Sequence, residues 1–224
     1  MPSVLIIGAS RGIGREFVNQ YLADGWTVHA TARSDKDIEA LTAAGASAYA
    51  ADTGDEDSLA KLAKAVPGDL DLLIVNAGVN VDGYEPDMGD VDAADWQRVM
   101  TINALGPVLA VRQLREHLQR PGGTIGILSS TLGSIGDNEG GGIWTYRMSK
   151  AALNAAIRNM QLAMKDQGIG VVSLHPGWVK TDMGGAQAPL GVTESVNGLR
   201  RVLAEVRADD DRPFVDYQGK TLPW

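Results

Sequence analysis

The stretch SVLIIGASRGIG, residues 3–14, decides the fold of this chain. The apolar run before Gly8 is typical of a parallel strand buried on both faces. Residues 12–24 follow with helical spacing, so Gly8, Gly12 and Gly14 lie where the strand turns into the helix. Glycines at such a turn let backbone N–H groups approach a pyrophosphate, and the helix N-terminus adds partial positive charge. The stretch therefore predicts a nucleotide-binding strand–helix unit.

The same alternation of strand and helix continues to the end of the chain. We expect further strands at 27–32, 47–52, 71–78, 124–130 and 170–177, and an edge strand at 213–217. We expect helices at 35–44, 55–65, 92–119, 145–167 and 193–206. The helix over 92–119 should be bent at Gly106-Pro107. Repeated right-handed crossovers of this kind build a doubly wound sheet. The sequence predicts one Rossmann-like α/β domain over residues 1–224, with a roughly seven-stranded parallel sheet flanked by helices.

Composition narrows the class of protein. The 224 residues include no cysteine, which excludes disulfides, thiolate metal sites and a cysteine nucleophile. A net charge of −8 argues against nucleic-acid binding, and no apolar run is long enough for a membrane span. The three histidines, His29, His117 and His175, have no metal-ligand spacing, so we expect them to be structural and expect no metal. A cytoplasmic protein without membrane or nucleic-acid partners is predicted.

The choice of nucleotide depends on residues near the glycine loop. No Gly-Lys-Ser/Thr follows the loop, which disfavours a P-loop NTPase. An NAD-preferring site usually has an acidic residue at the end of the second strand. Here Ala32 and Arg33 stand there, and Arg11 lies inside the loop. Two arginines suit a 2′-phosphate, so the sequence predicts NADP(H) in preference to NAD(H).

A second motif carries the chemistry. Tyr146 and Lys150 are four residues apart on a predicted helix and therefore share one face. A nearby ammonium should lower the phenol pKa, which suits a general acid acting on a carbonyl. Ser129 and Ser130 end the preceding strand at the rim where open α/β sheets bind ligands. Either hydroxyl could hold a substrate carbonyl.

In these motifs and their order the chain resembles the short-chain dehydrogenase/reductase superfamily, and the segments YRMSKAALN, HPGWVKTDMGG and GKTLPW resemble its C-factor and sniffer-type carbonyl reductase group. The resemblance implies that Ser130 orients the carbonyl, Tyr146 transfers the proton, and Lys150 lowers the phenol pKa and binds the nicotinamide ribose. It also implies that Asn103 holds a water linking Lys150 to solvent. The cofactor-binding residues it implies are Gly8, Ser10, Arg11, Gly12, Ile13, Gly14, Arg33, Asp52, Asn76, Ala77, Gly78, Tyr146, Lys150, Pro176, Gly177, Val179 and Thr181.

Three features depart from the superfamily pattern. Ile7 stands where a loop-bracing threonine is usual. The stretch before Tyr146 is about three residues longer, carried by residues 136–142, which leaves Ser129 as an alternative to Ser130. The segment after Thr181 is short, so we expect a small lid and an open pocket.

The main prediction is an NADPH-dependent reductase of aldehydes or ketones, acting on a small molecule as a homodimer or homotetramer. Trp144, Trp178, Leu132 and Met183 flank its presumed site and could line an apolar pocket. The alternative is an NADPH-binding signalling or sensor protein of C-factor type with little turnover. A serine hydrolase is disfavoured because no Gly-x-Ser-x-Gly elbow is present. A sugar-nucleotide epimerase normally needs a longer chain.

Overall fold

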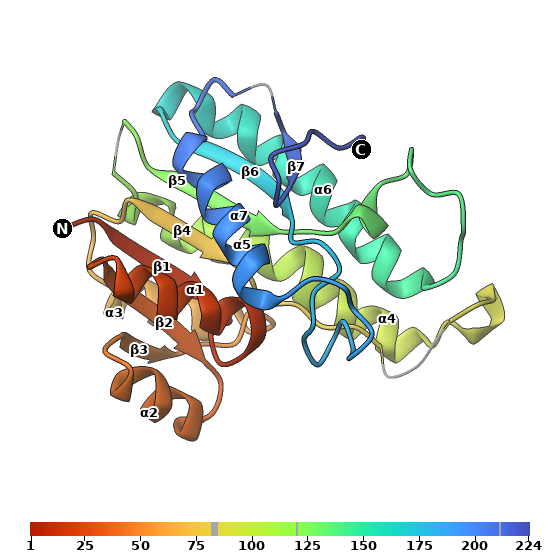
Figure 1. Ribbon diagram of the computed structural model, residues 1–224, viewed down its shortest axis with the longest axis horizontal. Helices are drawn as coiled ribbons and strands as arrows, with labels where there is room; N and C mark the ends of the chain where they lie inside the picture. The colour runs from red at the N-terminus through yellow and green to blue at the C-terminus, as the bar shows by residue number, and fades with distance from the viewer. Residues whose placement is uncertain (82–84, 120, 211) are drawn as a thin grey trace.

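The computed structural model describes residues 1–81, 85–119, 121–210 and 212–224. Its centre is a seven-stranded parallel sheet in the order β3-β2-β1-β4-β5-β6-β7 (Figure 1). The strands are β1 (Ser3–Ile7), β2 (Thr27–Ala32), β3 (Ser47–Ala50), β4 (Leu72–Val75), β5 (Thr124–Leu128), β6 (Gly170–His175) and β7 (Phe214–Asp216). The predicted Rossmann-like fold is confirmed.

Helices cover both faces of this sheet (Figure 1). One face carries α1 (Gly12–Ala23), α2 (Asp35–Ala43) and α7 (Val192–Glu205). The other carries α3 (Glu56–Ala65), α5 (Gly106–Leu114) and α6 (Trp144–Met164), with α4 (Ala93–Met100) packed on α6. Alternate residues of β1 enter the two cores, as a doubly covered strand requires.

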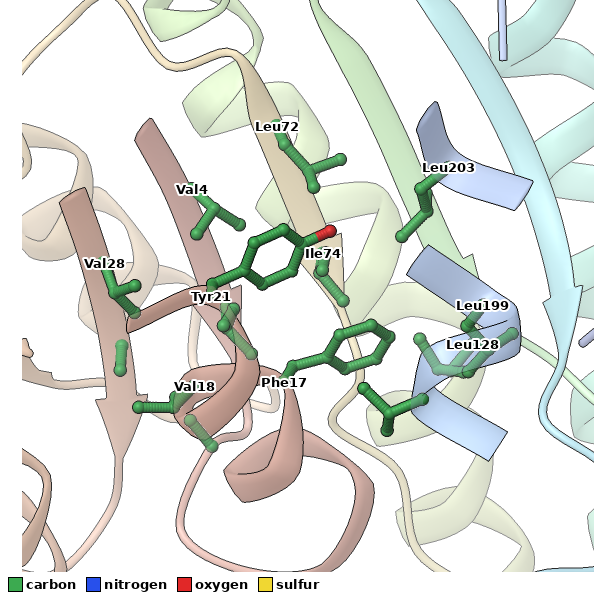
Figure 2. Packing of buried hydrophobic residues seen from close by; sticks show 14 of the residues in the cluster. Val4, Phe17, Val18, Tyr21, Val28, Leu72, Ile74, Leu128, Leu199 and Leu203 are labelled. Atoms are coloured by element: carbon green, nitrogen blue, oxygen red, sulfur yellow. The ribbon is translucent and has the colours of Figure 1, made fainter. Parts of the chain in front are cut away.

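The core under α1 fixes the start of that helix relative to the sheet. Phe17 is fully buried and Tyr21 nearly so, and Figure 2 shows both rings directed between the sheet and α7. Leu199 and Leu203 approach them from α7. Truncating a buried phenylalanine typically costs about 3–5 kcal/mol. The glycine turn before α1 is therefore held by a well-packed core.

The crossover after β3 creates the binding edge. The chain runs outward from β1 to β3 and then returns to place β4 on the other side of β1. Ile7 and Val75 are register partners, so Gly8 and Asn76 leave the sheet together. Ligands of open α/β sheets bind at this point, outside the carboxyl ends of the strands.

The segment expected to be helical over 92–119, with a bend at Gly106-Pro107, is helical from Ala93 to His117 but not α-helical throughout. A π-helical turn, Thr101–Leu105, separates α4 from α5, and a short 3-10 turn, Arg115–His117, ends the segment. Pro107 has no N–H to donate four residues back, and the N–H of Gly106 donates to Thr101 O, five residues back. The sequence indicated a bend here, and the structure shows it as a π turn.

Several strands are shorter than predicted because their last residues leave the sheet. Residues 51–52, 76–78, 129–130 and 176–177 lie beyond β3, β4, β5 and β6. The N–H groups of Ala51, Asn76, Ala77 and Ser129 still donate to carbonyls of the neighbouring strands, so these segments stay at the edge of the sheet. Each of these segments belongs to the site described below.

None of the helices in the described part of the chain is long and apolar enough to cross a membrane. Nor do the described residues gather three or more His, Cys, Asp or Glu side chains that could hold a metal.

Candidate active site

A pocket of about 430 Å³ opens at the carboxyl ends of the strands. Most of the predicted site residues line it. These are Gly8, Ser10, Arg11, Gly12, Ile13, Arg33, Asp52, Asn76, Ala77, Gly78, Tyr146, Lys150, Pro176 and Thr181. Among the described lining residues we do not find Gly14, Asn103, Ser130, Gly177 or Val179, whereas Ser129, the alternative to Ser130, does line the pocket.

The glycine turn packs closely on the end of β4. Gly8 has φ +84°, and a Cβ there would lie 2.8 Å from the Cα and N of Ala77. A Cβ on Gly14 would lie 2.1 Å from Gly8 O and 2.7 Å from the Asn76 side-chain nitrogen. Positions 8 and 14 therefore have room only for the hydrogen side chain of glycine. The turn is thereby held against the strand edge that forms the pocket floor.

Two hydrogen bonds brace Gly8 from both neighbouring strands. Asn76 Nδ2 donates to Gly8 O at 2.7 Å, and Gly8 N donates to Thr31 Oγ1 at 3.0 Å. Thr31, from β2, thus supplies a bracing hydroxyl although Ile7 provides none. Sequence reasoning missed Thr31; the signal was a threonine one residue before Ala32, near the carboxyl end of the strand.

The start of α1 is suited to an anion. Its N-cap residue, Arg11, makes no side-chain capping bond, whereas α2 and α3 are capped by Ser34 and Asp55. The first N–H groups of a helix have no partner within it, and the dipole makes this end positive. Gly12 and Ile13 begin the helix and line the pocket. The loop therefore fits a pyrophosphate.

Three cationic side chains line the pocket. They are Arg11, Arg33 and Lys180, and Arg11 is paired with Asp182 at 2.5 Å. Both members of that pair are about three-quarters exposed, so the pair is worth about 0–1 kcal/mol and can open for a phosphate. Lys180 and Asp182 were not predicted. Ala32, at the end of β2, is buried and offers no carboxylate.

Asp52, which lines the pocket, is hydrogen-bonded within the turn that follows β3. Its Oδ1 accepts from Gly54 N at 2.8 Å, and its own N–H donates to Ser58 Oγ at 3.0 Å. These bonds fix the carboxylate at the pocket wall.

Tyr146 and Lys150 lie together on the face of α6 that lines the pocket. Lys150 Nζ is 5.7 Å from the centre of the Tyr146 ring and donates to Leu128 O at 2.8 Å. Burial lowers the pKa of Lys150 to about 8. Burial also raises the pKa of Tyr146 to about 12, against a lowering by its hydrogen bond with Ser130. The expected lowering of the phenol pKa by the ammonium is wrong for this structure, because desolvation raises the pKa of Tyr146 and the Lys150 ammonium donates to Leu128 O instead.

The two serines after β5 point in different directions, as successive residues of an extended chain do. Ser130 is hydrogen-bonded to Tyr146 and also accepts from Leu132 N at 3.1 Å. Ser129 Oγ donates instead to Asn154 Oδ1 at 2.6 Å within the core. Of the two candidates, the geometry brings Ser130 to the tyrosine.

Asn103 connects the end of β4 to α6 from a fully buried position in the π turn. Its Oδ1 accepts from Val79 N at 2.8 Å, and its Nδ2 donates to Val79 O at 2.7 Å and to Ser149 Oγ at 3.0 Å. Ser149 Oγ donates in turn to Tyr146 O. Asn103 therefore holds the tyrosine's backbone as well as the pocket wall.

The segment after β6 lies over the glycine loop. A Cβ on Gly12 would lie 3.3 Å from Thr181 Cγ2, and Thr181 Oγ1 accepts from Gly184 N at 3.1 Å. Val179 pairs with Leu190, and Gly177 turns the chain with φ +85°. Trp178 and Met183 are more than half exposed on this segment, and of the two, Met183 lines the pocket.

Replacing Lys150 by methionine should stabilise the protein. Below pH 8 the folded chain holds a buried ammonium. The lowering of its pKa from 10.5 to about 8 corresponds to a cost of about 3 kcal/mol for burying that charge. Losing the bond to Leu128 O offsets about 1 kcal/mol. Lys150→Met should therefore raise the free energy of unfolding by about 2 kcal/mol at pH 7.

This gain should shrink as pH rises from 8 to 10.5, because there the folded state has lost its proton while the unfolded state keeps it. Urea unfolding across this pH range measures the effect, with the exposed Lys61→Met as control. A destabilised Lys150→Met protein at pH 7 would contradict it.

Comparison with known proteins agrees with this geometry. The short chain dehydrogenase family model matches residues 2–189. The C-signal protein of Myxococcus xanthus is 44% identical over 158 residues, covering 70% of this chain and 94% of its own. A Burkholderia multivorans short-chain dehydrogenase/reductase solved with bound NADP superposes with a TM-score of 0.93 at 36% identity, covering 100% of this chain and 99% of its own. Carbonyl reductase Sniffer of D. melanogaster gives 0.91 at 30% identity over all of both chains. The chain therefore belongs to the short-chain dehydrogenase/reductase family, in the group that includes the C-signal protein and the Sniffer carbonyl reductase.

Proposed function

We propose that this protein is an NADPH-dependent carbonyl reductase that converts aldehydes or ketones to alcohols, or the reverse. The observation that carries the proposal is the grouping of Tyr146 with Lys150 on one face of α6 and with Ser130 close by, at the pocket that also holds the uncapped start of α1. Structural neighbours solved as NADP-bound or NADPH-bound reductases support it.

The protein's own groups would act on the carbonyl oxygen. The Ser130 hydroxyl donates a hydrogen bond to it, and the Tyr146 hydroxyl transfers its proton to the same oxygen as the alcohol forms. Lys150 holds its positive charge below pH about 8 and favours the phenolate left behind. Bound NADPH supplies the hydride that the carbonyl carbon takes up. Proton and hydride together balance the reduction.

The cofactor would be held along the length of the pocket. The turn from Gly8 to Gly14 and the start of α1 take the pyrophosphate, and Asp52 lies at the adenine end. Asn76, Ala77 and Gly78 would hold the nicotinamide ribose, and Pro176 and Thr181, from the segment after β6, would cover it. Arg11 and Arg33 also line the pocket and would pair with a 2′-phosphate, which favours NADP(H).

A charge reversal at Arg33 should separate the two cofactors. Arg33 lines the pocket and is exposed, and a charge-assisted bond to phosphate is worth about 1.5–3 kcal/mol. Arg33→Asp should weaken NADPH binding by about tenfold or more and leave NADH binding within a factor of about two. Titration of tryptophan fluorescence with each nucleotide measures both. Arg201→Asp, an exposed site on α7, is the control, and equal losses for the two nucleotides would exclude this role for Arg33.

NADPH consumption across a panel of small aliphatic and aromatic carbonyls, beside a binding titration, tests the proposed function. Turnover on members of the panel supports the reductase. Tight NADPH binding with no turnover on any carbonyl would instead favour a cofactor-binding signalling protein, the reading that the C-signal relative suggests.

Exposed apolar side chains on the outer helices support a homodimer or homotetramer. Trp96, Leu105 and Leu162 are 37%, 49% and 59% exposed on α4, the π turn and α6. Apolar side chains of this size are more often covered in an assembly. Sedimentation of the purified chain gives its oligomeric state.

A further inference from the structure

The helix that carries the proposed catalytic tyrosine begins without a cap of its own. Its N-cap residue, Ile143, has φ 49° and ψ 46° and makes no side-chain capping bond. The first N–H groups of any helix lack partners within it. Tyr146 lies in this first turn, so its position depends on what satisfies those groups.

A carboxylate from a distant part of the chain takes this place. Glu85 Oε2 accepts from Thr145 N at 2.8 Å, and Glu85 Oε1 accepts from Thr145 Oγ1 at 2.7 Å. The backbone carbonyl of Glu85 also accepts from Ile143 N at 2.8 Å. Glu85 is 5% exposed and Thr145 is fully buried, although 60 residues separate them. A negative charge at the start of a helix is stabilised by the helix dipole.

We propose that Glu85 is a positioning residue for Tyr146. Three bonds fix residues 143 and 145, directly before the tyrosine, while Ser130 arrives from β5 on the other side of the site. The hydroxyl of Tyr146 must meet that of Ser130 for the proposed proton transfer. A misplacement of about 1 Å can cost about 10²-fold in rate. The inference deepens the proposed function and rests on it for the kinetic effect only.

A second tie on the next turn of α6 supports this reading. Asn103 bonds Ser149 on α6 and also holds Val79, in the chain segment that leads towards Glu85. Thr145 and Ser149 are four residues apart and share a face of the helix. The first two turns of α6 are therefore anchored at two points, with Tyr146 between them.

Kinetics of four variants test the proposal. Glu85→Ala should lower kcat by about tenfold or more, raise the primary isotope effect seen with NADPH deuterated at the transferred position, and leave the NADPH Kd within about threefold. Thr145→Val, which keeps the N–H bond, should lose less, and Thr145→Ser should match the wild type. The double variant Glu85→Ala/Thr145→Val should be no slower than Glu85→Ala alone, because Glu85→Ala already removes the bond that Thr145→Val removes.

The matched control is Asp92→Ala, which removes the cap of α4. Asp92 also accepts two backbone bonds, from Ala94 N and Asp95 N, both at 2.9 Å. The Asp92→Ala substitution should lower the unfolding temperature while kcat and the isotope effect stay unchanged. All rates are measured well below the unfolding temperature of each variant. A Glu85→Ala protein that behaves as Asp92→Ala does would overturn the proposal.

A measurement without turnover separates this inference from the proposed function. In a crystal structure of Glu85→Ala, the Tyr146 hydroxyl should have moved away from Ser130 Oγ; in Thr145→Ser it should not. An unmoved hydroxyl would overturn the positioning role. Absence of carbonyl-dependent NADPH oxidation in the wild type would reject only the reductase. If Glu85→Ala fails to fold, the structure and rates of Thr145→Val decide instead, and a wild-type result there would reject the proposal.

Discussion

Tyr146→Phe should abolish carbonyl reduction while NADPH binding remains within about twofold of the wild type. The substitution removes one oxygen and keeps the ring, which lines the pocket beside Lys150. A general acid contributes about 10²–10⁴ to a rate, and no other hydroxyl in the described pocket is bonded to Ser130 in its place. We therefore expect kcat to fall by about 10²–10⁴-fold.

Steady-state kinetics and a fluorescence titration check this result. Tyr49→Phe is the matched control. Tyr49 lies on β3, the edge strand of the sheet, and its hydroxyl contacts Nδ1 of His29 on β2 at 3.2 Å, away from the pocket. It should leave kcat unchanged. Retention of more than a tenth of the wild-type rate in Tyr146→Phe would exclude the tyrosine as the proton donor.

Much of the fold was predictable because its signals are local. The continuous apolar strands, the glycine turn at Gly8 and the alternation of elements each depend on a few neighbouring residues, and the seven-stranded parallel sheet is confirmed. Strand lengths were overestimated where residues such as Asn76 directly follow an apolar run but lie beyond the strand and line the pocket. Periodicity alone does not record that departure.

The parts of the site that were missed depend on contacts between distant segments. Thr31 bonds Gly8 across 23 residues, and Glu85 bonds Thr145 across 60. No spacing rule joins such pairs. The π turn at Asn103 was visible only as a bend near Pro107, because the choice between a kink and a wider turn depends on tertiary packing. The direction of the Tyr146 pKa shift was wrong for a similar reason, since burial cannot be measured in a sequence.

Gly14→Ala should nearly abolish NADPH binding and also destabilise the fold. Alanine raises helix propensity by about 1 kcal/mol, and this effect alone would be stabilising in α1. The new Cβ, however, would lie 2.1 Å from Gly8 O and 3.0 Å from Ala9 Cα, which are backbone atoms that no rotamer change can move. Overpacking of this kind costs about 1–3 kcal/mol and more when backbone must shift. We expect the cost of the clash to exceed the gain in helix propensity, so that the substitution destabilises the fold.

Relief of this clash has to move the glycine turn away from α1, and that movement also disturbs the bond from Asn76 Nδ2 to Gly8 O. The N–H groups that form the proposed phosphate site would then no longer converge, so we expect NADPH affinity to fall by about 100-fold and the free energy of unfolding by about 2 kcal/mol. Gly68→Ala is the control: a Cβ there meets nothing within 4 Å, and its backbone φ is not positive. It should be neutral or stabilising by about 0.4–1 kcal/mol. Urea unfolding without nucleotide, beside an NADPH titration, separates the two effects. Wild-type affinity in a folded Gly14→Ala protein would mean that the cofactor does not depend on this turn.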